Sequence, residues 1–135
     1  MEERFTLSLA RGFVIPDDQE LLMGLLSQLA LVQGFDYILT TGGTGVGPRD
    51  VTPEATLGVI QKRLPGFERA MTSESLAKTP HAMISRAVAG TLGRSIILNM
   101  PGSPKAVRET LTAVLPAMGH ALEKLQGDPS DCGAA

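Results

Sequence analysis

The chain changes three times from a run of β-forming residues to a helical pattern, each time through a short loop of glycine, proline or acidic residues. Strands that alternate with helices predict an α/β fold with a mostly parallel sheet covered on both faces. Because ligands of such sheets bind beyond the carboxyl ends of the strands, we expect the three loops to form the functional site. The length of 135 residues suits one such domain.

The first change lies near the N-terminus. Residues 5–15 favour a strand, and apolar residues recur at helical spacing over residues 21–32. Asp17 and Glu20 have the spacing of a capping box, in which a side-chain oxygen accepts a hydrogen bond from a backbone amide of the first helical turn. Capping accounts for one of the adjacent aspartates, Asp17 and Asp18, and leaves the other available for chemistry.

The second change contains the strongest functional signal, a loop with four glycines within six positions: Gly42, Gly43, Gly45 and Gly47. Glycine lets the main chain approach a ligand closely, and the N-terminus of a following helix favours anions. No Gly-Lys-Ser/Thr follows, so this is not a Walker loop, and the glycine spacing differs from the dinucleotide fingerprint. The pattern indicates a phosphate site, and the alternative is a glycine-rich turn without a ligand.

Asp50 lies between this loop and the next helix, which we expect to begin with Thr52 as its cap and Pro53 as its first residue. A carboxylate beside a phosphate is repulsive unless Mg²⁺ lies between them. Asp50 therefore indicates a magnesium site. The alternatives are that Asp50 caps the helix or pairs with Arg49.

The third change follows a short apolar strand at residues 95–99. Gly102, Ser103 and Lys105 would form a second anion site at a helix N-terminus, although Ser103 is also an ordinary N-cap. We expect Pro116 to kink or split the helix that follows, because proline lacks an amide hydrogen.

Three arginines, Arg63, Arg86 and Arg94, either neutralise a bound phosphate or are solvated. Each of them alone is typical of the surface. A further helix is expected over part of residues 66–77, with a less regular stretch over residues 85–90.

Composition restricts the partners. A net charge of −2 argues against a nucleic-acid groove over a whole face. The sequence contains no run of 18 apolar residues, so it predicts no membrane span. Cys132 is the single cysteine and cannot form an internal disulfide, which suits a reducing compartment. We expect a cytoplasmic protein with one domain over residues 1–126 and a flexible tail over residues 127–135.

Residues 40–56, TTGGTGVGPRDVTPEAT, resemble the signature of the MogA/MoaB family of molybdenum cofactor synthesis proteins, which includes the gephyrin G domain. Further similar segments follow in family order, PGF at 65–67, SRAVAG at 85–90 and NMPGSP at 99–104. The resemblance covers residues 14–125. Insertase relatives usually carry Gly-Gly-Val-Ser and CinA-type relatives favour Gly-Leu-Gly-Pro, so the Gly-Gly-Thr-Gly of this chain resembles the adenylyltransferase branch.

The resemblance implies a three-layer α/β/α domain that binds molybdopterin and Mg²⁺-ATP and produces adenylyl-molybdopterin and pyrophosphate. It carries catalytic roles onto Asp17 and Asp50, with magnesium at Asp50. It places substrate and nucleotide binding on Gly42, Gly43, Thr44, Gly45, Ser85, Pro101, Gly102 and Ser103. The family also implies a homotrimer and transfer of the product to a molybdenum insertase, with neither nucleic acid nor membrane as partner.

The chain differs from the family pattern at its start. Family members usually begin with an additional strand and helix, and that strand carries a Ser-Asp pair and helps to hold the pterin phosphate. No such segment precedes Val14 here. The alternative function is therefore a non-catalytic or weakly active molybdopterin-binding module, and a third is a relative that acts on a different nucleotide substrate.

Overall fold

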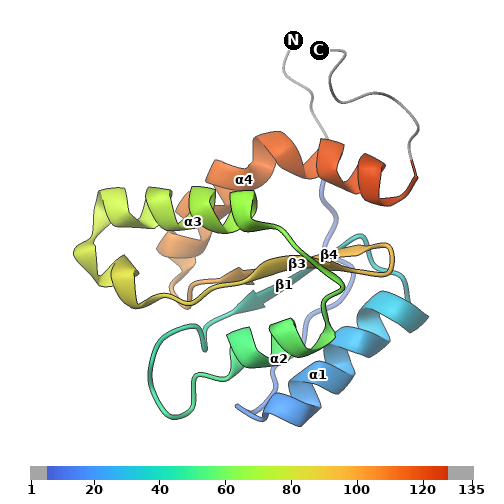
Figure 1. The fold of residues 1–135 in the computed structure, drawn as a ribbon, viewed down its shortest axis with the longest axis horizontal. Helices are drawn as coiled ribbons and strands as arrows, with labels where there is room; N and C mark the ends of the chain where they lie inside the picture. The colour runs from blue at the N-terminus through green and yellow to red at the C-terminus, as the bar shows by residue number, and fades with distance from the viewer. Residues whose placement is uncertain (1–5, 128–135) are drawn as a thin grey trace.

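A computed structural model describes residues 6–127, in which a sheet lies between two layers of helices (Figure 1). The strands are β1 (Tyr37–Thr41), β2 (Lys62–Arg63), β3 (Ala89–Leu92) and β4 (Ser95–Met100), in the spatial order β1-β4-β3-β2. The pair β1–β4 is parallel, whereas β3 runs antiparallel to both β4 and β2.

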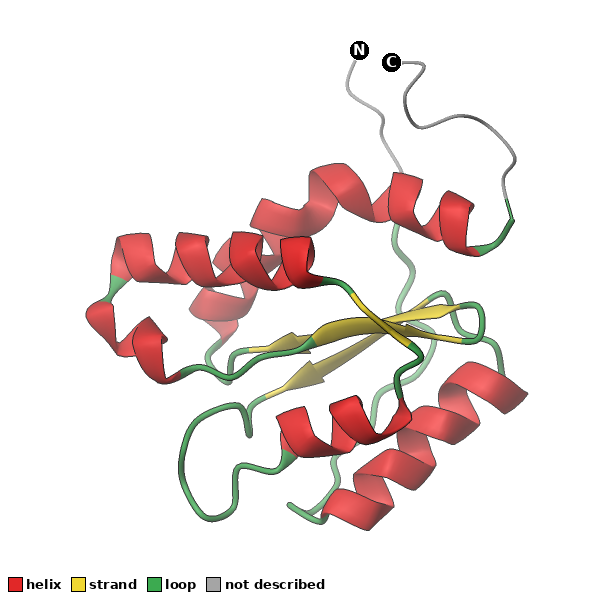
Figure 2. Cartoon of the chain, in the orientation of Figure 1, coloured by secondary structure: helices red, strands yellow, loops and turns green. Residues whose placement is uncertain are grey.

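The helices form the two outer layers. They are α1 (Gln19–Ser27), extended by the π-helical turn η1 (Gln28–Val32), then α2 (Thr52–Val59), α3 (Pro65–Lys78), the short 3-10 helix η2 (Pro80–Ile84) and α4 (Pro104–Leu125). Helices α1 and α2 cover one face of the sheet, and α3 and α4 cover the other (Figure 2). The predicted α/β/α class is confirmed. No helix within residues 6–127 combines the length and apolar composition that crossing a bilayer requires.

Strand β4 is the centre of the core, and all of its residues are buried. Side chains of successive strand residues point to opposite faces, so β4 supplies both layers. Ile97 packs with Leu26 of α1 on one side, while Leu98 packs with Met71 of α3 and Met118 of α4 on the other. This alternation explains why three successive residues of β4, Ile96, Ile97 and Leu98, are all apolar.

The strand directions correct the expectation of a mostly parallel sheet. Strands β3 and β4 are joined by Gly93 and Arg94 alone, and Leu92 pairs with Ser95 across the turn. A two-residue connection can join only antiparallel neighbours, because a parallel pair needs a long crossover. Gly93 has φ +59, a conformation that glycine adopts without strain.

The expected strand over residues 5–15 does not form in the described part, residues 6–15. These residues are nearly all exposed, and the chain crosses the sheet layer from the α4 side to the α1 side rather than following β1 (Figure 1). β-forming composition produces a strand only where the main chain has a neighbour to pair with. Within residues 6–127, strand β1 therefore keeps one unpaired edge.

Helix α4 runs without a break through Pro116, so the proline does not split it. Proline removes one intrahelical hydrogen bond, but the buried side chains of Val114 and Met118 on either side pack against the sheet. The helix expected within residues 66–77 is confirmed as α3. Of the tail expected at residues 127–135, residues 128–135, with Cys132, lie outside the described residues.

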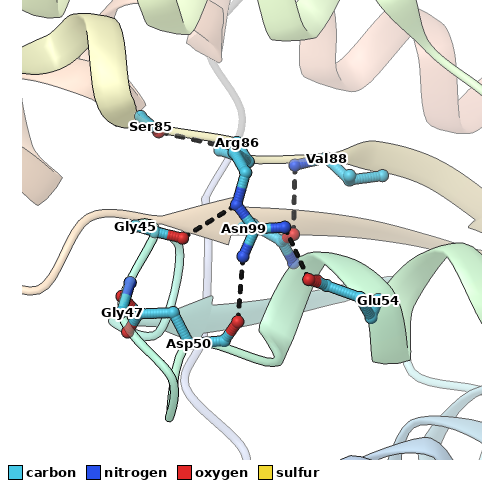
Figure 3. A network of polar contacts seen from close by, with 9 residues as sticks. Gly45, Gly47, Asp50, Glu54, Ser85, Arg86, Val88 and Asn99 are labelled. Carbon is cyan, nitrogen blue, oxygen red and sulfur yellow. Dashed lines mark hydrogen bonds and ion pairs between the residues drawn. The ribbon is translucent and has the colours of Figure 1, made fainter.

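Asn99 of β4 is a buried polar residue that joins several elements. Its Oδ1 accepts a hydrogen bond from the Val88 amide at 3.0 Å (Figure 3). Its Nδ2 donates to the hydroxyls of Thr40 in β1 and Thr56 in α2, each at 3.0 Å. The side chain thus connects the strand that carries the glycine loop to the helix that follows the loop.

We expect Asn99→Ala to lower the free energy of unfolding by about 3 kcal/mol, because an unpaired buried polar group costs about 1–3 kcal/mol and several would be left. Urea titration followed by circular dichroism measures the loss. Gln61→Ala is the control, since exposed Gln61 accepts one hydrogen bond, from the Gly93 amide. Equal losses in the two variants would contradict a connecting role for Asn99.

Candidate functional site

The parallel register of β1 and β4 brings the second and third loops together. Thr41 pairs with Met100 at the carboxyl ends of the two strands, and the Gly42 amide donates to the Met100 carbonyl at 3.0 Å. A Cβ on Gly42 would lie 3.9 Å from Cα of Gly102. The glycine loop (residues 42–50) and the Pro-Gly-Ser-Pro loop therefore adjoin at one edge of the sheet, as the sequence predicts.

Gly43 lies against the start of α2. It has φ +69, and a Cβ at this position would overlap the hydroxyl oxygen of Thr52. That hydroxyl donates to the Gly42 carbonyl at 3.2 Å, and the Thr52 amide donates to the Gly43 carbonyl at 3.2 Å. The expected capping role of Thr52 is therefore wrong: Val51 occupies the cap position, and the Thr52 side chain instead holds the loop.

Asp50 turns back into the glycine loop. Its Oδ2 accepts a hydrogen bond from the Gly47 amide at 2.8 Å, and a Cβ on Gly45 would come within 2.9 Å of the same oxygen. The carboxylate neither caps α2 nor forms an ion pair with Arg49. Oδ1 accepts no hydrogen bond from residues 6–127 and remains available to a ligand.

Arg86 has a role that the sequence does not predict, because its donors engage the glycine loop and Glu54. Its backbone amide donates to the Thr44 carbonyl at 2.8 Å, and Nε donates to the Gly45 carbonyl at 2.8 Å. Nη2 donates to the Asp50 carbonyl at 2.9 Å, and Nη1 lies 2.5 Å from Oε1 of Glu54 (Figure 3). The only sequence signal was its place in the SRAVAG segment.

Glu54 balances the charge of Arg86. The hydrogen bond from the guanidinium lowers the pKa of the Glu54 carboxyl below its usual value, so the carboxyl is ionised at neutral pH. Its Oε2 is buried and accepts no hydrogen bond from the described residues. Glu54 lies in the first turn of α2, where the positive end of the helix also favours its charge.

Asp17 and Asp18 have separate positions. Asp18, and not Asp17, is the N-cap of α1, and its Oδ1 accepts from the Leu21 amide at 3.0 Å. Asp17 is exposed and lines a groove of about 1250 Å³ that also reaches Gly42 and Gly43. We call it the β1 groove, since its walls are residues 6–18, strand β1 and the adjoining sides of α1 and α4.

The remaining candidates divide between two places. Pro101 and Gly102 lie beside the glycine loop, and the Ser103 hydroxyl caps α4 by accepting from the Ala106 amide at 3.1 Å. Ser85 is exposed and lines a second hollow of about 800 Å³ with Arg69, beyond Arg86. Within residues 6–127, no three His, Cys, Asp or Glu side chains gather to hold a metal.

Together, fold and site define an α/β domain with a glycine-rich loop, several of whose amides are unpaired within residues 6–127, at the carboxyl ends of two parallel strands. The family model described as a probable molybdopterin binding domain matches residues 3–120. The chain therefore belongs to the molybdopterin-binding domain family, and its resemblance to the MogA/MoaB proteins is confirmed.

Several named proteins are similar to this chain. A molybdopterin adenylyltransferase of Helicobacter pylori is 42% identical over 115 residues, and gephyrin of Dictyostelium discoideum is 46% identical over 116 residues. These matches cover 85% and 86% of this chain but only 65% and 16% of the relatives, so the chain spans less than two thirds of either protein. The solved structure of the molybdopterin biosynthesis enzyme MoaB of Thermus thermophilus aligns with a TM-score of 0.77 at 48% identity, over 86% of this chain and 73% of that one.

We expect Gly43→Ala to lower the free energy of unfolding by about 1–3 kcal/mol, because it forces a side chain into a left-handed conformation and against Thr52. Thermal unfolding followed by circular dichroism measures the change. Gly24→Ala is the matched control, since Gly24 lies in α1 with nothing within 4 Å of its added Cβ. That variant should gain about 0.5–1 kcal/mol, and a neutral Gly43→Ala would show that the loop conformation is not required.

Proposed function

We propose that the chain catalyses the Mg²⁺-ATP-dependent adenylylation of molybdopterin in molybdenum cofactor biosynthesis. The observation that carries the proposal is a row of unpaired amides in the glycine loop beside a free carboxylate oxygen of Asp50. The amides of Thr44, Gly45 and Val46 make no hydrogen bond within residues 6–127. Relatives named molybdopterin adenylyltransferase support the choice of substrate.

Two loops would receive the phosphates. The free amides of the glycine loop, including that of Thr44, suit the oxygens of the pterin phosphate. The N-terminus of α4, with Pro101, Gly102 and Ser103, suits the nucleotide, because the positive end of a helix attracts phosphate. Ser85 lies farther along the Arg86 side and would contact only an extended part of a ligand.

Asp50 would hold magnesium through its free oxygen. Mg²⁺ usually binds one or two carboxylates and takes its other ligands from water and substrate phosphates, and this agrees with the lack of a three-residue cluster in residues 6–127. When bound, the ion would neutralise charge on the departing pyrophosphate.

In the reaction, an oxygen of the pterin phosphate attacks the α-phosphorus of ATP. The bond from that phosphorus to the bridging oxygen of the β-phosphate breaks, and pyrophosphate leaves. The loop amides would orient the attacking phosphate and stabilise the charge on the transferring group. Asp17 would act from the β1 groove, which Gly42 and Gly43 also line.

The proposal also covers the location of the enzyme, its oligomeric state and the acceptor of its product. Membership of the family supports a cytoplasmic homotrimer that passes its product to a molybdenum insertase. A net charge of −2 supports small phosphorylated substrates over nucleic acid.

One observation favours the alternative, a molybdopterin-binding module with little or no activity. The edge of β1 is unpaired within residues 6–127, and the β1 groove leaves that side of the site open. An open site excludes water less well, which weakens electrostatic stabilisation of a transition state. Tight pterin binding without pyrophosphate release in the presence of Mg²⁺-ATP would favour the module.

We expect Asp50→Asn to lower kcat/KM for pyrophosphate release by about 100-fold or more, because it removes the charge that holds magnesium while keeping an oxygen for the Gly47 amide. A coupled pyrophosphate assay with ATP, Mg²⁺ and molybdopterin measures the rate. Glu74→Gln is the control, since Glu74 lies in α3 and lines neither the glycine loop nor the β1 groove. An unchanged rate in Asp50→Asn would remove Asp50 from the mechanism.

Measurements of stability and of reaction rate should distinguish the roles of Asp17 and Asp18. We expect Asp17→Asn to keep the wild-type unfolding midpoint and to lose about 100-fold in kcat, the lower end of the range for a positioned general acid or base. Asp18→Ala should lose about 1 kcal/mol of stability, because it removes the cap of α1. Its rate per folded molecule should not change. Full activity in Asp17→Asn would refute the catalytic assignment.

A further inference from the structure

We propose that Arg86 is the positioning residue of the glycine loop, and that it sets the orientation of the loop peptides so that their free amides face a bound phosphate. The proposal rests on the proposed function for the identity of that phosphate. It assigns to Arg86 a task other than contact with substrate.

The geometry of the peptide unit carries the first step. In a trans peptide, the carbonyl and the following amide hydrogen point in opposite directions. The residues of the loop have trans peptide bonds. Arg86 binds the Thr44 carbonyl through its amide and the Gly45 carbonyl through Nε. The next amides, those of Gly45 and Val46, therefore point away from Arg86.

The same reasoning applies at the end of the loop. Nη2 of Arg86 binds the Asp50 carbonyl, so the Val51 amide also points away from the guanidinium. The Val51 amide makes no hydrogen bond within the described residues, like those of Gly45 and Val46. Each of these three free amides thus follows a carbonyl that Arg86 holds. Successive amides with this exposure form anion-binding concavities.

The charge of Arg86 is already used. Nη1 pairs with Glu54, while Nε and Nη2 bind carbonyls of the loop. Three of its five N–H groups therefore have acceptors inside the protein, and its charge is balanced by Glu54. This separates a positioning role from direct binding of phosphate by positive charge.

The arrangement needs arginine in particular. The planar guanidinium presents its donors in a fixed fork, which matches acceptors on Gly45, Asp50 and Glu54 at the same time. A lysine ammonium carries the same charge at one point and cannot bind the three acceptors in that geometry. We call the binding of these three acceptors by one guanidinium the clamp. Arg86→Lys keeps the positive charge but removes the clamp.

The test uses inorganic pyrophosphate as the probe, in isothermal titration, with the full chain. We expect Arg86→Lys and Arg86→Gln both to weaken pyrophosphate binding by about 10-fold or more, which is the loss of about 1.4 kcal/mol of binding free energy. Arg94→Lys is the matched control, because exposed Arg94 lies in the β3–β4 turn at the opposite end of β4 from the glycine loop, and its side chain makes no hydrogen bond or ion pair within the described residues. If Arg86→Lys binds as well as the wild type, the clamp is refuted.

A second readout reports the loop itself. We expect {¹H}-¹⁵N heteronuclear NOE values of Gly45 and Val46 to fall in both Arg86 variants, while those of core residues such as Ile97 stay at wild-type values. Loss of affinity with unchanged loop order would overturn positioning in favour of direct binding. Absence of pyrophosphate binding in the wild type would also overturn the proposal.

Neither readout needs molybdopterin. Failure of adenylyl transfer in the wild type would therefore count against the proposed function alone. A change in the two Arg86 variants would still support the clamp.

Discussion

The parallel ladder between β1 and β4 is the constraint on which the candidate site depends. Because both strands end at the same edge, Gly42 and Pro101 leave the sheet side by side, and the Gly42 amide pairs with the Met100 carbonyl. The ladder is held from within by Asn99, whose amide group reaches both β1 and α2. A buried side chain with all its partners in place stabilises one register and disfavours others.

A loop with this many glycines loses much conformational entropy when it adopts one shape. Here the loss is offset by contacts from three directions. Thr52 holds the start of the loop, the Asp50 carboxylate holds its middle through the Gly47 amide, and Arg86 holds carbonyls along it. The amides are left free because the side chains engage mainly carbonyls. The same contacts that order the loop therefore prepare it for an anion.

The opposite side of the site is built differently. The β1 groove runs along an unpaired strand edge, and Asp17 reaches it from a segment without regular secondary structure. Asp17 is exposed there, so its charge interacts more weakly than a charge in an enclosed site would. The proposed site therefore joins an ordered glycine loop to a groove along an unpaired strand edge.

The sequence alone determined what depends on neighbouring residues: the helix periodicities, the glycine loop after a strand, the Ser103 cap and the helix start at residues 52–54. It also indicated the family, through motifs in a fixed order. Tertiary structure decided the features that depend on contact between residues far apart in the sequence. Residues 6–15 have β-forming composition but pair with no strand, the Thr52 hydroxyl turns to the loop, and Arg86 meets Glu54 across 32 positions. Such contacts produce no periodic pattern in the sequence, because the two partners come close to each other only once the chain between them has folded.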